Sequence, residues 1–237
     1  MPGSELVQSL VRGLELLRMA GSRSGGMRLN ELADAAGLKV NTAHNLVRTL
    51  CARGFLVKDA MNRFTTGPAI FELVAGMREE AQRERMGREL LQLNAKFPHD
   101  TLTVSTIDAG MVRCVLRISL DRPGELQKTP EIVFAPYTST TAVVLQSGAS
   151  EAVTTLEKQY PFEEYGAGMW GSLAAFAKIR KEVRRRGYYM RQNQEHFTLA
   201  FLLPDGYALG FSGDAPASTL AQRIEAGKGF RNAVQQP

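Results

Sequence analysis

Three short amphipathic segments follow one another near the start of the chain, and a glycine separates the second from the third. Apolar residues recur in each at the helical spacing i, i+3, i+4, i+7: Val7, Leu10, Val11 and Leu14; Leu29, Leu32, Ala33 and Ala36; Ala43, Leu46, Val47 and Leu50. We expect helices over about residues 5–19, from residue 29, and over 40–50. Asn30 is suited to cap the second helix and Gly37 to end it in left-handed geometry. This arrangement is typical of a helix-turn-helix.

A change of period after Gly54 predicts a β-hairpin. The runs "FLVKD" (55–59) and "RFTT" (63–66) are β-prone, and "DAMN" between them is suited to a turn. Three helices followed by a hairpin make a winged helix-turn-helix. Its wing would carry Lys58 and Arg63 towards a phosphate backbone.

The third predicted helix has one apolar and one polar face. Its outer surface carries amide, imidazole, hydroxyl and guanidinium groups. Asn and Arg side chains can each form two hydrogen bonds with a base edge, and Thr and His side chains can hydrogen-bond to phosphates. The residues that we predict to contact DNA are Arg12, Lys39, Asn41, Thr42, His44, Asn45, Arg48, Arg53, Lys58 and Arg63. A polar face that is only solvated is the alternative interpretation.

The charge distribution favours a polyanionic partner for this segment. The chain carries a net charge of +5. Residues 1–66 contain nine Lys or Arg and five Asp or Glu, whereas the rest of the chain is nearly balanced. A basic excess in one small module is typical of nucleic-acid binding.

These segments resemble the DNA-binding domain of the IclR family of bacterial transcriptional regulators. The resemblance rests on "SLVRGLELLRMA", "LNELADAAGL", "NTAHNLVRTLCARGFL" and "RFTTGP", over roughly the first third of the chain. Asn41 stands where the family usually has Ser, and Asn45 where it often has Arg. The resemblance implies a sequence-specific DNA-binding regulator, repressor or activator, that acts as a homodimer or a dimer of dimers. It also implies a linker helix and a GAF-like effector-binding domain.

The remaining chain predicts an α+β domain. A helix is expected over 68–97, with an apolar start at Ile70, Leu73, Val74 and Met77 that could pack against a second copy. Beyond it, β-prone runs such as "TLTVSTI", "FTLAFLL" and "YALGFS" alternate with helical segments, and "PDGY" predicts a hairpin turn. Ser172 is a predicted N-cap and Gly187 a predicted helix end. We expect a winged helix-turn-helix over 1–67, the linker helix, and a GAF-like domain with a mostly antiparallel sheet over 98–237.

The resemblance places a pocket for a small organic acid or aromatic effector in the second domain. Its position predicts Tyr137, Ser139, Thr140, Thr141, Arg191, His196 and Thr198 as lining residues. Hydroxyl groups at a helix start can accompany backbone amides that bind a carboxylate. The run "TSTT" could equally only cap a helix. The chain departs from the family at "YTSTTAVVLQS" and "RQNQEH", which leaves open an effector-independent regulator with a decayed pocket.

Other motifs point to no catalytic residue, metal site or cofactor. The spacing of the three histidines does not match that of metal ligands. We expect Cys51 and Cys114 to be buried thiols, in a protein of the reducing cytoplasm. "GAGMWG" (166–171) matches a dinucleotide motif in letters but follows no strand, so we expect a loop. "KIRKEVRRRG" reads as a solvated helix face, with a second DNA contact as the alternative. No signal peptide or membrane span is expected. The rival hypothesis is a small-molecule-binding or enzymatic α+β domain with a fused helical module.

Overall fold

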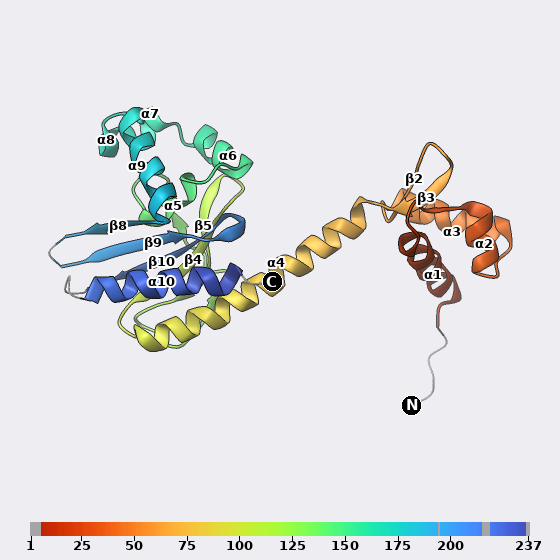
Figure 1. Ribbon diagram of the computed structural model, residues 1–237, viewed down its shortest axis with the longest axis horizontal. Helices are drawn as coiled ribbons and strands as arrows, with labels where there is room; N and C mark the ends of the chain where they lie inside the picture. The colour runs from red at the N-terminus through yellow and green to blue at the C-terminus, as the bar shows by residue number, and fades with distance from the viewer. Residues whose placement is uncertain (1–5, 194, 215–218, 236–237) are drawn as a thin grey trace. The chain divides into compact units, whose positions relative to one another are not determined.

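The computed structural model describes residues 6–193, 195–214 and 219–235. It divides into two compact units, Met1–Glu80 and Ala81–Pro237. One continuous helix, α4 (Pro68–Lys96), occupies the span expected to link two domains, and the division falls inside it. Pro68 suits the first turn, where a backbone N–H would have no helical partner. Each unit has its own core (Figure 1).

The N-terminal unit contains three helices and a three-stranded sheet. The helices and a two-stranded hairpin were expected, whereas the strand over Met27–Arg28 was not. Its core joins Leu16, Leu32, Ala43, Val47 and Leu56. The sheet has the strand order β1-β3-β2. The elements are α1 (Gln8–Ser22), β1 (Met27–Arg28), α2 (Leu29–Ala35), α3 (Val40–Ala52), β2 (Leu56–Lys58) and β3 (Arg63–Thr66).

Local turn chemistry in this unit was predicted in part. Gly37 has a φ of +62°, which confirms the expected left-handed turn. In "DAMN", the Asp59 carboxylate accepts hydrogen bonds from the backbone N–H groups of Met61 and Arg63. The prediction of Asn30 as N-cap was wrong. Met27 and Arg28 pair with β3, so Arg28 is the extended residue before α2, and its N–H donates to Glu31 Oε2 at 2.7 Å.

The C-terminal unit is built on an antiparallel sheet with the order β6-β5-β4-β10-β9-β8, and β7 pairs with β5. This confirms the expected sheet type. The expected hairpin joins β9 and β10 through a 3-10 turn over Pro204–Gly206. The strands are β4 (Thr101–Asp108), β5 (Met111–Ile118), β6 (Gln127–Lys128), β7 (Val133–Phe134), β8 (Tyr188–Gln192), β9 (Phe197–Leu202) and β10 (Tyr207–Gly213).

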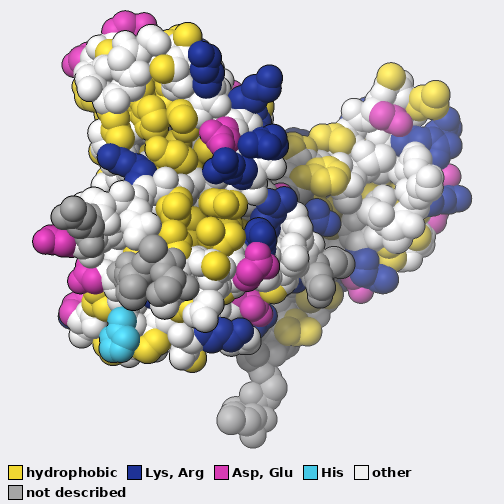
Figure 2. Space-filling model, turned by 60° about the vertical axis from the view of Figure 1, so that its left-hand side comes forward, with side chains coloured by type: hydrophobic (Ala, Val, Ile, Leu, Met, Phe, Trp, Pro, Cys, Tyr) yellow, Lys and Arg dark blue, Asp and Glu magenta, His cyan; other side chains and the backbone are white. Residues whose placement is uncertain are grey.

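Helices cover both faces of this sheet (Figure 1). Met86 and Leu90 of α4, with Phe230 of α10, pack on one face against alternate strand residues such as Leu102. A second core around Val143 and Phe176 lies on the other face. The helices of this unit beyond α4 are α5 (Thr140–Gln146), α6 (Glu151–Gln159), α7 (Phe162–Tyr165), α8 (Ala167–Trp170), α9 (Leu173–Arg186) and α10 (Leu220–Gln235). Apolar side chains are also exposed on this unit, among Lys and Arg side chains (Figure 2).

The connection before α9 differs from the expectation. The residues of "GAGMWG" form the short helix α8 rather than a loop, and Gly171 then takes a φ of +72°. The Ser172 hydroxyl accepts a hydrogen bond from Ala175 N–H at 3.2 Å, which confirms the predicted cap. Gly187 ends α9 at a φ of +80°, again as predicted. None of the described helices is both long and apolar enough to cross a bilayer.

Candidate nucleic-acid interface and ligand cavity

The outer face of α3 carries polar side chains that take no part in the core of the N-terminal unit. Ala43 and Val47 are buried in the unit core, and Leu46 and Leu50 pack against it. Asn41, His44, Asn45 and Arg48 are exposed, and Thr42 is half-buried. The period of an α-helix sets this division, because positions 43, 46, 47 and 50 fall on one side.

A groove of about 580 Å³ runs between α3, the start of α2 and the hairpin. It brings together three of the predicted residues, His44, Arg48 and Lys58. Among the described residues that line it there is no Asp or Glu, so the groove is electropositive. Arg28 and Asn62 also line it, and the sequence analysis missed both. Their place depends on β1 pairing with the hairpin, a non-local contact.

The other predicted basic residues do not line this groove. Arg12 on α1, Lys39 before α3 and Arg53 after α3 are exposed. Arg63 is half-buried and donates to the Gly26 carbonyl at 3.3 Å. Its guanidinium is therefore partly engaged within the unit, unlike that of Arg48.

A second cavity, of about 550 Å³, lies in the C-terminal unit between the sheet and α5. Six of the seven predicted effector residues line it. They come from segments far apart in the chain, and are Ser139, Thr140, Thr141, Arg191, His196 and Thr198.

Strand pairing arranges the floor of this cavity in two rows. In the first row Arg117 of β5 pairs with Thr103 of β4, which pairs with Gly210 of β10. In the second row Ser212 of β10 pairs with Thr101 and Thr198, and Thr198 pairs with Arg191 of β8. Side chains alternate across a sheet, so these polar residues share the face opposite to the Leu102 core.

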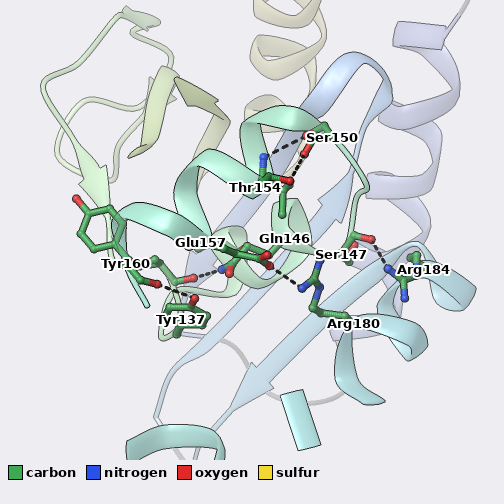
Figure 3. A network of polar contacts seen from close by, with 12 residues as sticks. Tyr137, Gln146, Ser147, Ser150, Thr154, Glu157, Tyr160, Arg180 and Arg184 are labelled. Carbon is green, nitrogen blue, oxygen red and sulfur yellow. Dashed lines mark hydrogen bonds and ion pairs between the residues drawn. The ribbon is translucent and has the colours of Figure 1, made fainter. Parts of the chain in front are cut away.

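Tyr137 does not line the cavity. It is buried between the rings of Phe162 and Phe176, with centroids 5.6 Å and 5.4 Å away. Its hydroxyl donates to the Tyr160 carbonyl at 2.8 Å (Figure 3). Burial raises the pKa of Tyr137, which keeps that donor protonated. Tyr137, the aromatic residue just before the polar run "TSTT", is therefore part of the core.

Hydrogen bonds hold the predicted cavity residues in place. The Ser139 hydroxyl accepts from Ala142 N–H at 3.2 Å, so Ser139 caps α5, as the alternative interpretation of "TSTT" held. The Thr140 and Thr198 hydroxyls are 2.6 Å apart. Arg191 Nη1 donates to the Thr138 carbonyl at 2.8 Å. Ser139, not Thr141, is the cap of α5, so the Thr141 hydroxyl lines the cavity without serving as a helix cap.

A polar network fastens the far end of α5 to the helices around it (Figure 3). Gln146 donates to the Pro136 carbonyl, and Arg184 donates to the Ser147 carbonyl at 3.0 Å. Arg180 and Glu157 form an ion pair at 2.6 Å between α9 and α6. The short helix that carries Thr140 and Thr141 is thus anchored at both ends.

The sequence analysis missed several lining residues, above all Arg117, Thr101, Thr103 and Ser212. A signal for the threonines was present, because hydroxyl and apolar residues alternate in "TLTV". No signal in the chain places Arg117 beside them, since that depends on the register of β5 against β4. Within the described residues, no three His, Cys, Asp or Glu side chains gather in a way that could hold a metal ion.

Comparison with known proteins finds relatives of the N-terminal helix-turn-helix. The model of the IclR helix-turn-helix domain matches residues 9–60. The transcriptional repressor IclR of Escherichia coli (strain K12) is 44% identical over 55 residues, which are 23% of this chain and 20% of that protein. The chain thus matches about a fifth of the length of this curated relative.

Solved structures share the fold of the whole chain. The repressor BlcR of Agobacterium tumefaciens is 18% identical with a TM-score of 0.50, over 98% of this chain and 97% of that one. An IclR homolog from Microbacterium hydrocarbonoxydans, complexed with 4-hydroxybenzoate, is 16% identical with a TM-score of 0.51, over 96% and 99%. Residues 9–60 are thus identified as an IclR helix-turn-helix domain, and the chain shares its fold with these solved structures.

Proposed function

We propose that the chain is a sequence-specific DNA-binding transcriptional regulator whose DNA affinity responds to a small organic acid or aromatic effector. The observation that carries the proposal is the exposed polar face of α3 within a matched IclR helix-turn-helix domain. A regulator of this kind acts where DNA is, in the cytoplasm.

In this proposal α3 enters the major groove. Asn45 and Arg48 present an amide and a guanidinium, which suit adenine and guanine edges, and His44 or Asn41 serve neighbouring bases or phosphates. Lys58 and Arg28, across the electropositive groove, suit the flanking phosphates. Arg12, Lys39 and Arg53 extend the basic surface around α3.

We also propose that the chain acts as a homodimer through its N-terminal unit. Leu10 and Leu14 of α1, and Val7 just before it, are exposed. Leu73, Val74 and Met77 are likewise exposed on α4, at helical spacing. Exposed apolar stripes of this kind mark protein interaction surfaces. Two copies would present two copies of α3 to a two-fold operator, and pairing of dimers into tetramers is a further proposal.

The cavity of the C-terminal unit is the proposed effector site. Its lining combines guanidinium and hydroxyl groups with the apolar side chains of Ile132 and Phe134. The homolog of the same fold that is complexed with 4-hydroxybenzoate supports an acidic effector. Binding would favour one of two arrangements of the DNA-binding heads, by its differential affinity for the two.

The test begins with selection of bound sequences from a random double-stranded DNA library by the full-length protein. The affinity of the enriched sequence is then measured by fluorescence anisotropy at several salt concentrations. We expect Arg48→Ala to weaken binding roughly tenfold to a hundredfold, the loss of a specific bidentate contact. Arg88→Ala removes the same charge from an exposed site on α4 and should leave affinity unchanged.

No enrichment of any sequence, or equal losses in the two variants, would contradict the proposal. Turnover of a small molecule without DNA binding would favour the rival enzymatic hypothesis instead.

A further inference from the structure

We propose that the cavity of the C-terminal unit takes an elongated dianion, a small molecule with an anionic group at each end, held between Arg117 and Arg191. This deepens the proposed function, on which it rests only in taking the cavity as the effector site. Dicarboxylates are the simplest members of this class.

The two arginines approach the cavity from opposite ends. Arg117 is on β5 and Arg191 is on β8, and the strand order places β4, β10 and β9 between them. Four strand spacings of about 4.8 Å put their backbones roughly 19 Å apart across the sheet. Both residues line the same cavity, so a ligand that extends along it can meet a guanidinium group from each side of the sheet.

The charges around the cavity leave these cations available. No Asp or Glu is among the described residues that line it. Within the described part of the chain, the Arg117 side chain makes no hydrogen bond and no ion pair, and the Arg191 side chain bonds only the Thr138 carbonyl and the Met169 sulfur. The nearby carboxylate of Asp214 pairs with His196 at 2.9 Å. A half-buried and an exposed cation at one cavity whose described lining holds no acid favour a ligand with two negative charges.

The middle of the cavity suits a neutral spacer. Gly210 belongs to the first row, and a Cβ atom there would meet Thr103 Oγ1 at 2.5 Å and Thr141 Oγ1 at 3.0 Å. The missing side chain therefore lets the Thr103 and Thr141 hydroxyls approach each other over the floor of the cavity. The hydroxyls of Thr101, Thr103 and Ser212 can donate to or accept from polar substituents on the spacer. A compact dianion such as phosphate could reach one arginine but not both.

Isothermal titration calorimetry of the full-length protein tests the proposal. The probes are straight-chain dicarboxylates from butanedioate to octanedioate, the monocarboxylates of the same lengths, and inorganic phosphate. We expect at least one dicarboxylate to bind ten times or more tightly than its monocarboxylate, with an optimum chain length. Phosphate should bind no better than the monocarboxylates.

Three single variants identify the anchors. Arg117→Gln and Arg191→Gln should each raise the Kd of the best dicarboxylate roughly tenfold to a hundredfold, the loss of one charge-assisted bond. In each of these two variants, the Kd of the best dicarboxylate should come close to the Kd of the matched monocarboxylate. Arg113→Gln makes the same change on β5 at an exposed ion pair with Asp108, outside the cavity, and should leave the Kd unchanged. Thermal denaturation of each variant shows that it is folded.

Three results would overturn the proposal: no dicarboxylate preferred over its monocarboxylate, equal losses in Arg113→Gln and Arg117→Gln, or no binding of any probe. None of them touches the operator-binding test above. Conversely, dicarboxylate binding that needs both arginines, in a protein that selects no DNA sequence, would uphold this inference and refute the regulator.

Discussion

At the scale of single residues, the C-terminal unit contains an ion pair with both partners buried. Arg223 of α10 donates twice to the Asp100 carboxylate, at 2.6 Å and 2.8 Å. The guanidinium carbon also lies 5.0 Å from the ring centroids of Phe97 and Phe197. The pair joins α10 to the loop between α4 and β4. Because both side chains are buried, water cannot solvate either charge if its partner is removed.

Asp100→Asn should therefore destabilise the C-terminal unit by about 3–5 kcal/mol, because it leaves a buried guanidinium without its counter-charge. Urea unfolding followed by the fluorescence of Trp170, the single tryptophan, measures this unit. Glu225→Gln, in the exposed pair with Lys228 on the same helix, is the matched control and should change stability little. A similar loss in both variants would show that burial is not the cause.

A second residue-scale prediction concerns pH. Burial raises the pKa of the Cys114 thiol from 9.0 to about 11. Between these values an unfolded thiol ionises while the folded one stays protonated, so stability should fall as pH rises from 9 to 11. The loss attributable to Cys114 is at most about 2–3 kcal/mol.

The measurement is the urea-unfolding free energy across this pH range in wild type and Cys114→Ala. The variant should lose less stability with pH, while tyrosines, which titrate in both proteins, cancel in the difference. Parallel curves for the two proteins would refute this role for the thiol.

At the scale of elements, α10 lies close against the sheet because glycine faces it. A Cβ atom at Gly227 would collide with the ring of Phe201 on β9, whereas one at Gly229 would meet open space. Two glycines on one helix, two residues apart, therefore have opposite roles. Gly227 permits close packing, and Gly229 only loosens the helix.

Gly227→Ala should destabilise the unit by about 1–3 kcal/mol through overpacking. Gly229→Ala should stabilise it by about 0.5–1 kcal/mol, because alanine loses less backbone entropy in a helix. Both are measured by the same urea titration, and each serves as the other's control. Changes of the same sign would contradict this account of α10.

At the scale of the whole molecule, the proposed dimer rests on apolar residues that the chain leaves uncovered. Leu10 is 61% exposed on α1, and Met61 in the hairpin is 70% exposed. Leu10→Glu should convert the protein to monomers, because it places a charge within the proposed interface. Met61→Glu should leave the assembly intact, since it lies on another surface of the same unit.

Light scattering after size-exclusion chromatography gives the mass of each variant. A monomeric wild type, or an unchanged mass for Leu10→Glu, would remove the support for dimerisation through α1. A wild-type mass of four chains would instead favour the paired dimers.

What could be predicted from the sequence was local. Helical periodicity and turn residues were enough for the three N-terminal helices, the hairpin, and the ends of α9 at Ser172 and Gly187, because near neighbours in the chain satisfy these backbone groups. The strand β8 was missed, and α8 was taken for a loop, because short segments take their conformation from what they pack against.

By itself the sequence determined the helix-turn-helix, the polar face of α3 and the α+β character of the second unit, since periods of 3.6 and 2 reflect which side of an element is buried. Only the tertiary structure decided that Tyr137 belongs to the core and that Arg117 shares a cavity with Arg191. Those placements depend on strand register and helix docking between residues distant in the chain, which no local pattern encodes.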